Sequence, residues 1–277
     1  MRLTIILDTA NCFFHYTTRD VAFEHILPNG KLKFSTYDQM RDPLENKDWS
    51  WSGSWPVDNP DLDAEDPLED AFFNFQEPAR WIRKQAHLLA LTVDAPGYSS
   101  HANGFAKGWA RARMWEQYGE NHAGVCLVFD QGLLKANLQT DLEKQLGFGP
   151  YHRMVQYDET GSVGTEATKL KPASWPKEIN AEFVAQYIED HHDELFFKKT
   201  LDWQTEYEYR FVTTASPEKP LLASYGDALI AVIVGDRFPD WQLPSAEKAS
   251  GAVEVDLLRM HWHGIAPKPR LLTRKSK

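Results

Sequence analysis

The chain has 277 residues, of which 42% are hydrophobic and 13% aromatic, so it is long enough to bury a sizeable core. Its 30 basic and 40 acidic residues give a formal net charge of -10, which repels a phosphate backbone and disfavours a general nucleic-acid-binding role. A small anionic ligand in a local basic pocket is compatible with this charge. No stretch of about 18 apolar residues occurs, so we expect no membrane span.

The only two cysteines, Cys12 and Cys126, each lie in an apolar stretch and are far apart in the sequence. This placement predicts two buried free thiols in a reducing compartment rather than a disulfide. The apolar opening of the chain is interrupted by Asp8 and Asn11 before any signal-like cleavage pattern appears. We therefore expect a cytoplasmic protein.

In chain order, the first elements alternate between strand and helix signals. A strand over 13–16 is followed by a helix that begins near Thr18 and ends at Gly30. Residues 31–36, KLKFST, alternate between charged and apolar side chains, which is typical of a strand. Residues 46–80 are dense in Asp, Glu, Pro and Trp and predict a long acidic loop or insertion.

The rest of the chain mixes helices and strands without regular alternation. Helices are predicted over 71–87, 104–120, 133–147 and 176–203, and strands over 88–94, 125–130, 151–158, 206–212, 228–235 and 252–262. Residues 265–277 form a basic tail that we expect to be frayed at its end. The pattern predicts an α+β fold in a single domain over 1–277, with a mixed, mostly antiparallel sheet and helical insertions.

Charged residues occupy every second position of the stretch EYEYRFV, residues 206–212. Because side chains alternate along a strand, Glu206, Glu208 and Arg210 should share one side of the sheet, with aromatic rings on the other. One interpretation is a solvated face on which the arginine offsets the two acids. The other is a polar cleft, in which a carboxylate orients a sugar hydroxyl and stabilises developing positive charge while the arginine fixes its ionisation.

Other candidates for a binding site lie earlier in the chain. His15 and Thr17 share one face of the first strand, where both could hydrogen bond to the same ligand hydroxyl, although a lone histidine is more often part of the core. Further candidates to contact a ligand are Ser35, Tyr37, Trp115 and His122. For Trp115 the alternative is packing in the core, because it lies at helical spacing from Tyr118.

Motifs for metal, dinucleotide, phosphate and ester chemistry are missing from the sequence. The histidines at 191–192 and at 261 and 263 lack the i, i+4 spacing of a helical zinc site, so no metal is expected. GxGxxG, GxxxxGK and GxSxG do not occur, which disfavours Rossmann-type dinucleotide enzymes, P-loop enzymes and α/β-hydrolases.

Four blocks of sequence resemble the bacterial domain-of-unknown-function family 2971. They are HYTT followed by a helix, LKFSTYDQMRDPLE, MWEQYGENHAGVCLVFD and KKTLDWQTEYEYRFV, and together they span about residues 13–235. Arg41 stands where the family usually has Asn, and Leu44 where it usually has Phe. The family name implies no activity.

The order of the His-x-Thr, Ser/Tyr and Glu-x-Glu strands also resembles, more weakly, the layout of ADP-ribosyltransferase folds. This second resemblance implies that His15 and Thr17 hold NAD, that Tyr37 stacks on nicotinamide, and that Glu208 binds the ribose with support from Glu206. Tyr16 stands where many such enzymes have glycine, so its backbone is expected to face the ligand. The implied activity is transfer of ADP-ribose to a macromolecule or hydrolysis of NAD, in a toxin or anti-phage effector with a protein target or cognate antitoxin.

Two other hypotheses stay open at this point. One is a non-catalytic nucleotide-sensing or interaction module in a bacterial stress or defence system. The other is a metal-dependent hydrolase or nuclease using Asp42, Glu45, Glu206 and Glu208, against which the net charge argues where the substrate is a nucleic acid.

Overall fold

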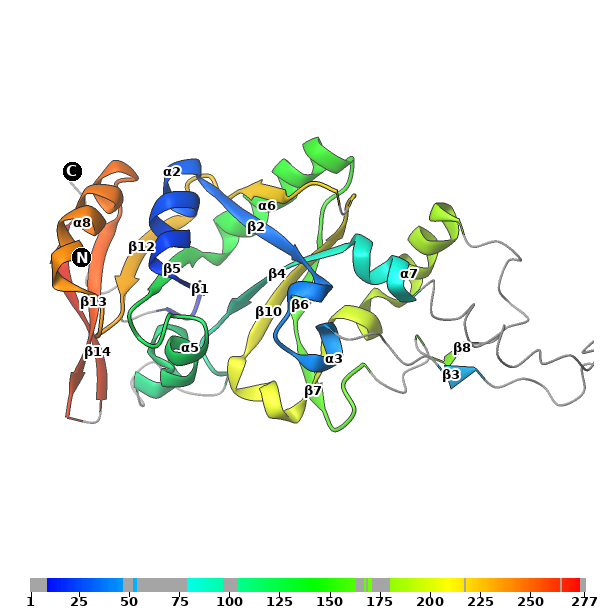
Figure 1. Cartoon of the computed structure of the whole chain (residues 1–277), viewed down its shortest axis with the longest axis horizontal. Coiled ribbons are helices and arrows are strands. Elements are labelled where there is room, and N and C mark those ends of the chain that lie inside the picture. The colour runs from blue at the N-terminus through cyan, green and yellow to red at the C-terminus, as the bar shows by residue number, and fades with distance from the viewer. Residues whose placement is uncertain are drawn as a thin grey trace, which may run out of the picture.

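The computed structural model describes residues 9–46, 52–53, 79–96, 104–162, 167, 169–170, 180–216, 218–264 and 266–274. These residues form helices around a mixed, mostly antiparallel sheet, which confirms the predicted α+β class (Figure 1). In the described part of the chain, no helix has the length and apolar character needed to cross a membrane.

The central sheet has ten strands among the described residues. Eight of them follow one another in the order β11-β2-β4-β1-β5-β12-β13-β14, and β10 pairs with both β4 and β6. Only the β12–β13 pair is parallel in this sheet of the described residues. The strand bounds are β1 Cys12–Thr17, β2 Lys31–Thr36, β4 Ala86–Thr92, β5 Val125–Asp130, β6 Tyr151–Met154, β10 Glu208–Thr214, β11 Leu221–Ser224, β12 Leu229–Val234, β13 Asp256–His263 and β14 Ala266–Thr273.

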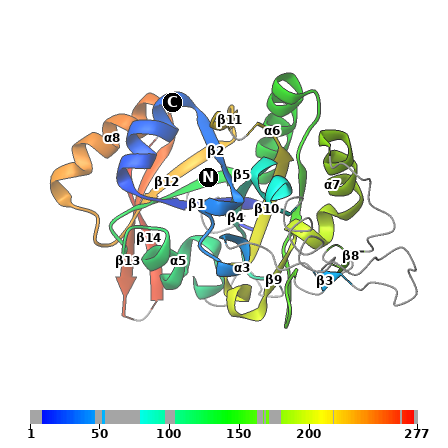
Figure 2. The same ribbon diagram turned by 45° about the vertical axis from the view of Figure 1, so that its right-hand side comes forward.

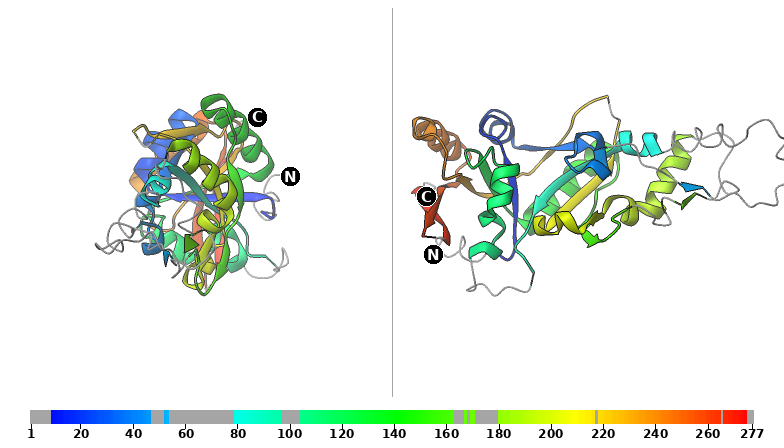
Figure 3. Two further views of the ribbon diagram at one scale, coloured as in Figure 1. Left: turned by 90° about the vertical axis from the view of Figure 1, so that its right-hand side faces the viewer. Right: turned by 60° about the horizontal axis from the view of Figure 1, so that its bottom comes forward.

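Within the described ranges, two short parallel strand pairs lie outside this sheet. They are β3 (Ser52–Gly53) with β8 (Lys169–Leu170), and β7 (Gln156–Asp158) with β9 (Lys198–Thr200). The β13–β14 hairpin and α8 lie at one end of the molecule and α7 lies at the other (Figure 3).

Helical segments cover the sheet or connect its strands. The α-helices are α2 Leu27–Asn29, α3 Pro43–Asn46, α5 Ala112–Gln117, α6 Gln131–Leu146, α7 Ala181–Phe196 and α8 Leu243–Ala252, and residues 79–85 are also helical. A π-helix, η1, spans Val21–Ile26. The 3-10 turns are η2 Tyr37–Gln39, η3 Gly104–Ala106, η4 Gly108–Ala110, η7 Leu201–Glu206 and η8 Asp240–Gln242.

Alternation along β1 builds the core on both faces of the sheet. Phe13 packs in one apolar cluster with Leu127 and Phe211, whereas the next residue, Phe14, packs in another with Trp115. Both rings are almost completely buried, because successive side chains of a strand point to opposite faces. Cys12 and Cys126 are both buried thiols and do not form a disulfide, as predicted.

Several predicted boundaries were wrong. The helix predicted over 176–203 ends at Phe196, and β9 and η7 follow it. The helix predicted over 104–120 is instead two 3-10 turns and the short α5. Much of the basic tail predicted over 265–277 is strand β14, whose register with β13 gives its backbone hydrogen-bond partners. Most of the predicted acidic insertion, 46–80, lies outside the described residues.

Candidate functional site

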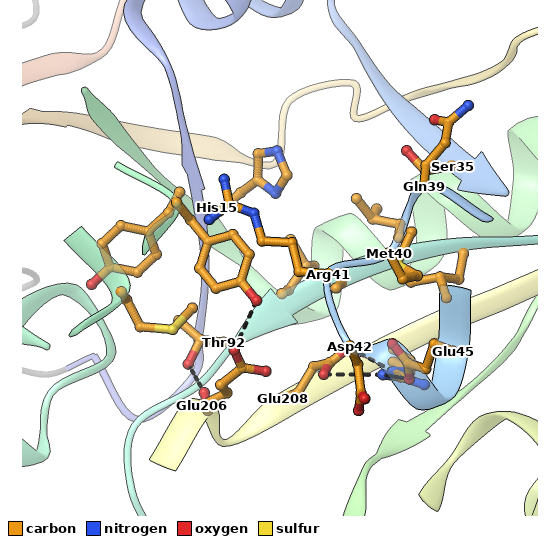
Figure 4. A pocket seen from close by; sticks show the side chains of 18 of the residues that line it. His15, Ser35, Gln39, Met40, Arg41, Asp42, Glu45, Thr92, Glu206 and Glu208 are labelled. Carbon is orange, nitrogen blue, oxygen red and sulfur yellow. Dashed lines mark hydrogen bonds and ion pairs between the residues drawn. The ribbon is translucent and has the colours of Figure 1, made fainter. Parts of the chain in front are cut away.

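A pocket of about 270 Å³ opens where β1, β2, β4 and β10 meet the segment 37–46 and the end of α5. Figure 2 shows β1, β4 and β10 in this region with α3 beside them. Residues of the predicted strands line it together, among them His15, Ser35 and Glu208 (Figure 4). Arg210 of β10 lines it as well. Strand order explains this convergence, because β4 pairs with β1 on one edge and with β10 on the other.

Five buried ionic side chains form an alternating chain of charges beneath the pocket. We call Glu206, Lys199, Glu208, Arg210 and Glu45, in that order, the charge chain. The Lys199 ammonium donates to Glu206 at 2.8 Å and to Glu208 at 3.1 Å. The Arg210 guanidinium donates from Nε to Glu208 at 2.5 Å and from Nη2 to Glu45. Each of the five is at most 7% exposed.

Glu206 and Glu208 are brought close together by a left-handed turn at Tyr207 and do not lie along one strand. Glu206 ends η7, and Tyr207 then adopts a left-handed conformation with φ of 45°, so β10 begins only at Glu208. The prediction that the strand begins at 206 was therefore wrong. The interpretation of a solvated face was also wrong, because Glu206, Glu208 and Arg210 are 3%, 5% and 1% exposed.

Burial and neighbouring charges shift the pKa values within the charge chain in different directions. Burial raises the pKa of Glu208, but Arg210 and Lys199 outweigh that effect and hold its pKa at about 2. Burial raises the pKa of Glu45 despite its contact with Arg210. Burial lowers the pKa of Lys199, yet the surrounding carboxylates raise it overall. Three carboxylates face two cations, so this wall of the pocket favours an additional positive charge or a hydrogen-bond donor.

His15 contributes a neutral imidazole to the same pocket. Burial lowers its pKa to about 4, and a hydrogen bond with the backbone of Ala90 opposes this only in part. Since that hydrogen bond raises the pKa, the ring N–H is its donor, and at neutral pH the other ring nitrogen is left as an acceptor for a ligand. Tyr16, the next residue, also lines the pocket, but its hydroxyl donates to the Gly108 carbonyl at 2.5 Å and its ring packs against Trp115.

Arg41 and Tyr118 lie at the rim. The Arg41 guanidinium is 4.7 Å from the centre of the Tyr118 ring and donates to the Gln117 carbonyl, which links the segment 37–46 to α5. The Tyr118 hydroxyl donates to Glu206 at 2.8 Å. Lys33 and Arg41 are exposed residues of the pocket lining, so they mark its solvent end.

Other predicted ligand contacts lie elsewhere. Thr17 is buried at the end of β1, and Trp115 is in the core, where its indole N–H donates to the Trp109 carbonyl at 2.8 Å. His122 lies 3.2 Å from Asp236. Tyr37 is 1% exposed, and its hydroxyl accepts from Arg210 at 3.4 Å while its ring packs against Phe196. Tyr37 thus contacts Arg210 from the same segment, 37–46, as Glu45.

Sequence reasoning missed Lys199, which bridges the two glutamates. Its stretch, KKTLDW, was predicted to be helical, and lysine in a helix is usually solvated. Two signals were available: its place in the KKTLDWQTEYEYRFV block that resembles the family, and its spacing of seven and nine residues before Glu206 and Glu208. The described residues contain no group of three or more His, Cys, Asp or Glu side chains that could hold a metal ion.

One family model matches part of the chain. Residues 114–211 are similar to the family described as "Protein of unknown function (DUF2971)". No curated protein and no solved structure matches the chain. The matched span contains every member of the charge chain except Glu45. The wider resemblance over 13–235 and the resemblance to ADP-ribosyltransferase folds find no support in these comparisons and stay predictions.

Proposed function

We propose that the pocket binds NAD by its nicotinamide-ribose half and that the protein cleaves the bond between the ribose and nicotinamide. The observation that carries this proposal is the position of Glu208, an ionised and buried carboxylate on the wall of a pocket that His15 also lines. Its pKa of about 2 keeps it negatively charged throughout the physiological range.

The chemistry needs a fixed negative charge. When the C1′–N bond breaks, its electron pair moves to the nicotinamide nitrogen, and positive charge develops on the ribose as an oxocarbenium ion. Glu208 is held by Arg210 and Lys199, so it can stabilise that charge without reorganising. A nucleophile then attacks C1′ and releases its proton to solvent, and in this proposal Glu206 orients that nucleophile.

The remainder of the pocket suits the other parts of the substrate. Neutral His15 and the hydroxyl of Ser35 can hydrogen bond to the ribose or the carboxamide. Lys33 and Arg41 at the solvent end can pair with the two phosphates. A volume of about 270 Å³ lies near the lower end of small-molecule sites, which are typically about 300–1,000 Å³, so it suits half of the dinucleotide.

Hydrolysis of the ADP-ribose unit and its transfer to a protein are both compatible with this site. Water as the nucleophile gives an NAD glycohydrolase, whereas a side chain of a protein target gives an ADP-ribosyltransferase. Either activity consumes NAD or modifies a target, which suits a toxin or anti-phage effector. Mass spectrometry of a cell lysate after incubation with the protein and NAD distinguishes the two fates.

Release of nicotinamide from labelled NAD tests the proposal. We expect Glu208→Gln to lower the rate on the order of a hundredfold or more, because it removes the charge that stabilises the transition state. Glu120→Gln is the matched control: this glutamate pairs with Arg19 outside the pocket, and its loss should leave the rate unchanged. No release by the wild type under varied acceptors and pH contradicts the proposal.

A second candidate is a nucleotide-sensing module without catalysis. It is favoured by the fact that both glutamates already have cationic partners in Lys199 and Arg210, as in a purely structural cluster. In that case NAD raises the melting temperature of the protein while no nicotinamide is released.

A further inference from the structure

Asp42 directly precedes α3 and lies at the N-terminus of that helix. Its carbonyl accepts from the amides of Glu45 and Asn46 at 2.9 Å, and its side-chain Oδ1 accepts from the Leu44 amide at 2.9 Å. Both contacts are those of a residue that caps the beginning of a helix. Capping of α3 thus accounts for one of the two carboxylate oxygens of Asp42, Oδ1.

The second oxygen, Oδ2, has no such explanation. It is buried and has no hydrogen-bond partner among the described residues, and Asp42 as a whole is 3% exposed. A buried carboxylate oxygen without a donor is unfavourable, because it has lost water and gained nothing in return. A helix cap does not require this burial. Asp130 caps α6 through the Leu133 amide at 2.9 Å and remains partly exposed to solvent.

Asp42 also lines the pocket, on the side where Glu45 and Glu208 lie (Figure 4). Asp42 adds a further carboxylate to the wall that Glu45 and Glu208 line, and a carboxylate attracts a hydrogen-bond donor and repels a phosphate group. A sugar hydroxyl is the donor that the proposed substrate brings to this depth of the pocket, since its phosphates are expected at the cationic rim formed by Lys33 and Arg41.

We propose that Asp42 is a ligand-binding residue whose Oδ2 accepts a hydrogen bond from a ribose hydroxyl of the bound nucleotide. This inference rests on the proposed function for the identity of the ligand. The helix cap fixes the carboxylate in place, so the acceptor is positioned before the ligand arrives. The segment 37–46 thereby serves both to close the pocket and to recognise the sugar.

The substitution Asp42→Asn separates the two roles of this residue. Asp42→Asn keeps an oxygen for the Leu44 amide but replaces the second acceptor with an NH₂ donor. Binding is measured by isothermal titration calorimetry with carba-NAD, in which a methylene replaces the ring oxygen of the nicotinamide ribose so that no cleavage occurs. We expect roughly ten- to a hundredfold weaker binding, the usual cost of losing a hydrogen bond to a charged group.

Two further variants control for folding. Asp42→Ser also preserves a cap while removing the carboxylate, and it should weaken binding similarly with a melting temperature close to that of the wild type. Asp130→Asn changes the equivalent cap of α6 and should bind like the wild type.

The outcomes distinguish this inference from the proposed function. If carba-NAD binds the wild type and both Asp42 variants equally well, the role of Asp42 is wrong while NAD binding stands. If carba-NAD does not bind the wild type, both proposals are wrong. Weaker binding by Asp42→Asn and Asp42→Ser, with normal binding by Asp130→Asn, supports the inference.

Discussion

Two arginines lie directly opposite each other in the sheet and have opposite environments. Arg210 of β10 pairs in register with Arg153 of β6, so both side chains leave the same face. Arg210 is 1% exposed and donates to Glu208, Glu45 and the Phe196 carbonyl. Arg153 has a side chain that is 45% exposed and pairs with Asp193 at 2.5 Å. The same residue type therefore belongs to a buried network on one strand and to solvent on the next.

The difference comes from what covers each strand. Residues 37–46 contribute Tyr37 and Glu45 over Arg210, whereas Arg153 lies at the edge formed by β6 and meets α7 through Asp193. Burial makes every missing partner of Arg210 costly, while water replaces the partner of Arg153 easily. A buried ionic network is weak evidence for stability, so its location beneath a pocket points to function.

Replacing each arginine by methionine gives the largest expected contrast. Arg210→Met leaves Glu45 and Glu208 close together with one cation fewer, so we expect a loss of about 3–5 kcal/mol in the free energy of unfolding. Arg153→Met should cost at most about 1 kcal/mol. Urea denaturation of both variants measures the two values.

A compensated variant identifies the cause of the Arg210 effect. Adding Glu45→Gln and Glu208→Gln to Arg210→Met removes the uncompensated charges, so much of the lost stability should return. If the triple variant is no more stable than Arg210→Met alone, loss of packing rather than unpaired charge explains the destabilisation.

His15, which lines the pocket, and the exposed His263 extend the comparison between buried and exposed groups. His15 has a pKa of about 4 in the folded state against 6.5 ordinarily, so the unfolded chain binds its proton first as the pH falls. Stability from this group is complete above pH 6.5 and is lost as the pH falls towards 4. Between pH 7 and 5 we expect His15 to account for about 2 kcal/mol of lost stability.

Denaturation of His15→Gln at a series of pH values measures this contribution. The variant should show a shallower fall in stability than the wild type over pH 7 to 5. His263→Gln, at an exposed position of β13, serves as the control and should follow the wild type. Parallel curves for wild type and His15→Gln contradict the assignment of the effect to His15.

Much of the sheet could be predicted from the sequence because its strands carry strong local signals. KLKFST and VCLVFD match β2 and β5 residue for residue, since alternation and β-branched side chains define them without tertiary information. The helix over 176–203 was predicted too long because KKTLDW has no local breaker. Its end at Phe196 reflects the pairing of β9 with β7, which is a long-range contact.

The site was harder to predict than the sheet. Glu206, Glu208 and Arg210 were grouped from their types and spacing, whereas His15 was joined to them only through the resemblance to ADP-ribosyltransferase folds. The burial of Arg210 also depends on Tyr37 and Glu45 of segment 37–46, which no local pattern places against it. The turn at Tyr207 was also invisible, because left-handed backbone is rare at an aromatic residue. Asp42 was considered as one of four carboxylates of a metal-dependent hydrolase, and its unpaired oxygen is apparent only in three dimensions.

The smallest effect on stability is expected for the salt bridge between the exposed Arg153 and Asp193. Asp193→Asn removes the charge that pairs with Arg153, and both side chains are nearly half exposed, at 49% and 45%. Water solvates the arginine after the change, so we expect a loss of at most about 1 kcal/mol, falling further in high salt. Urea denaturation at low and high salt measures it. If the free energy of unfolding falls by nearly as much as in Arg210→Met, then the ionic partner, and not burial, decides how much an arginine on this sheet contributes to stability.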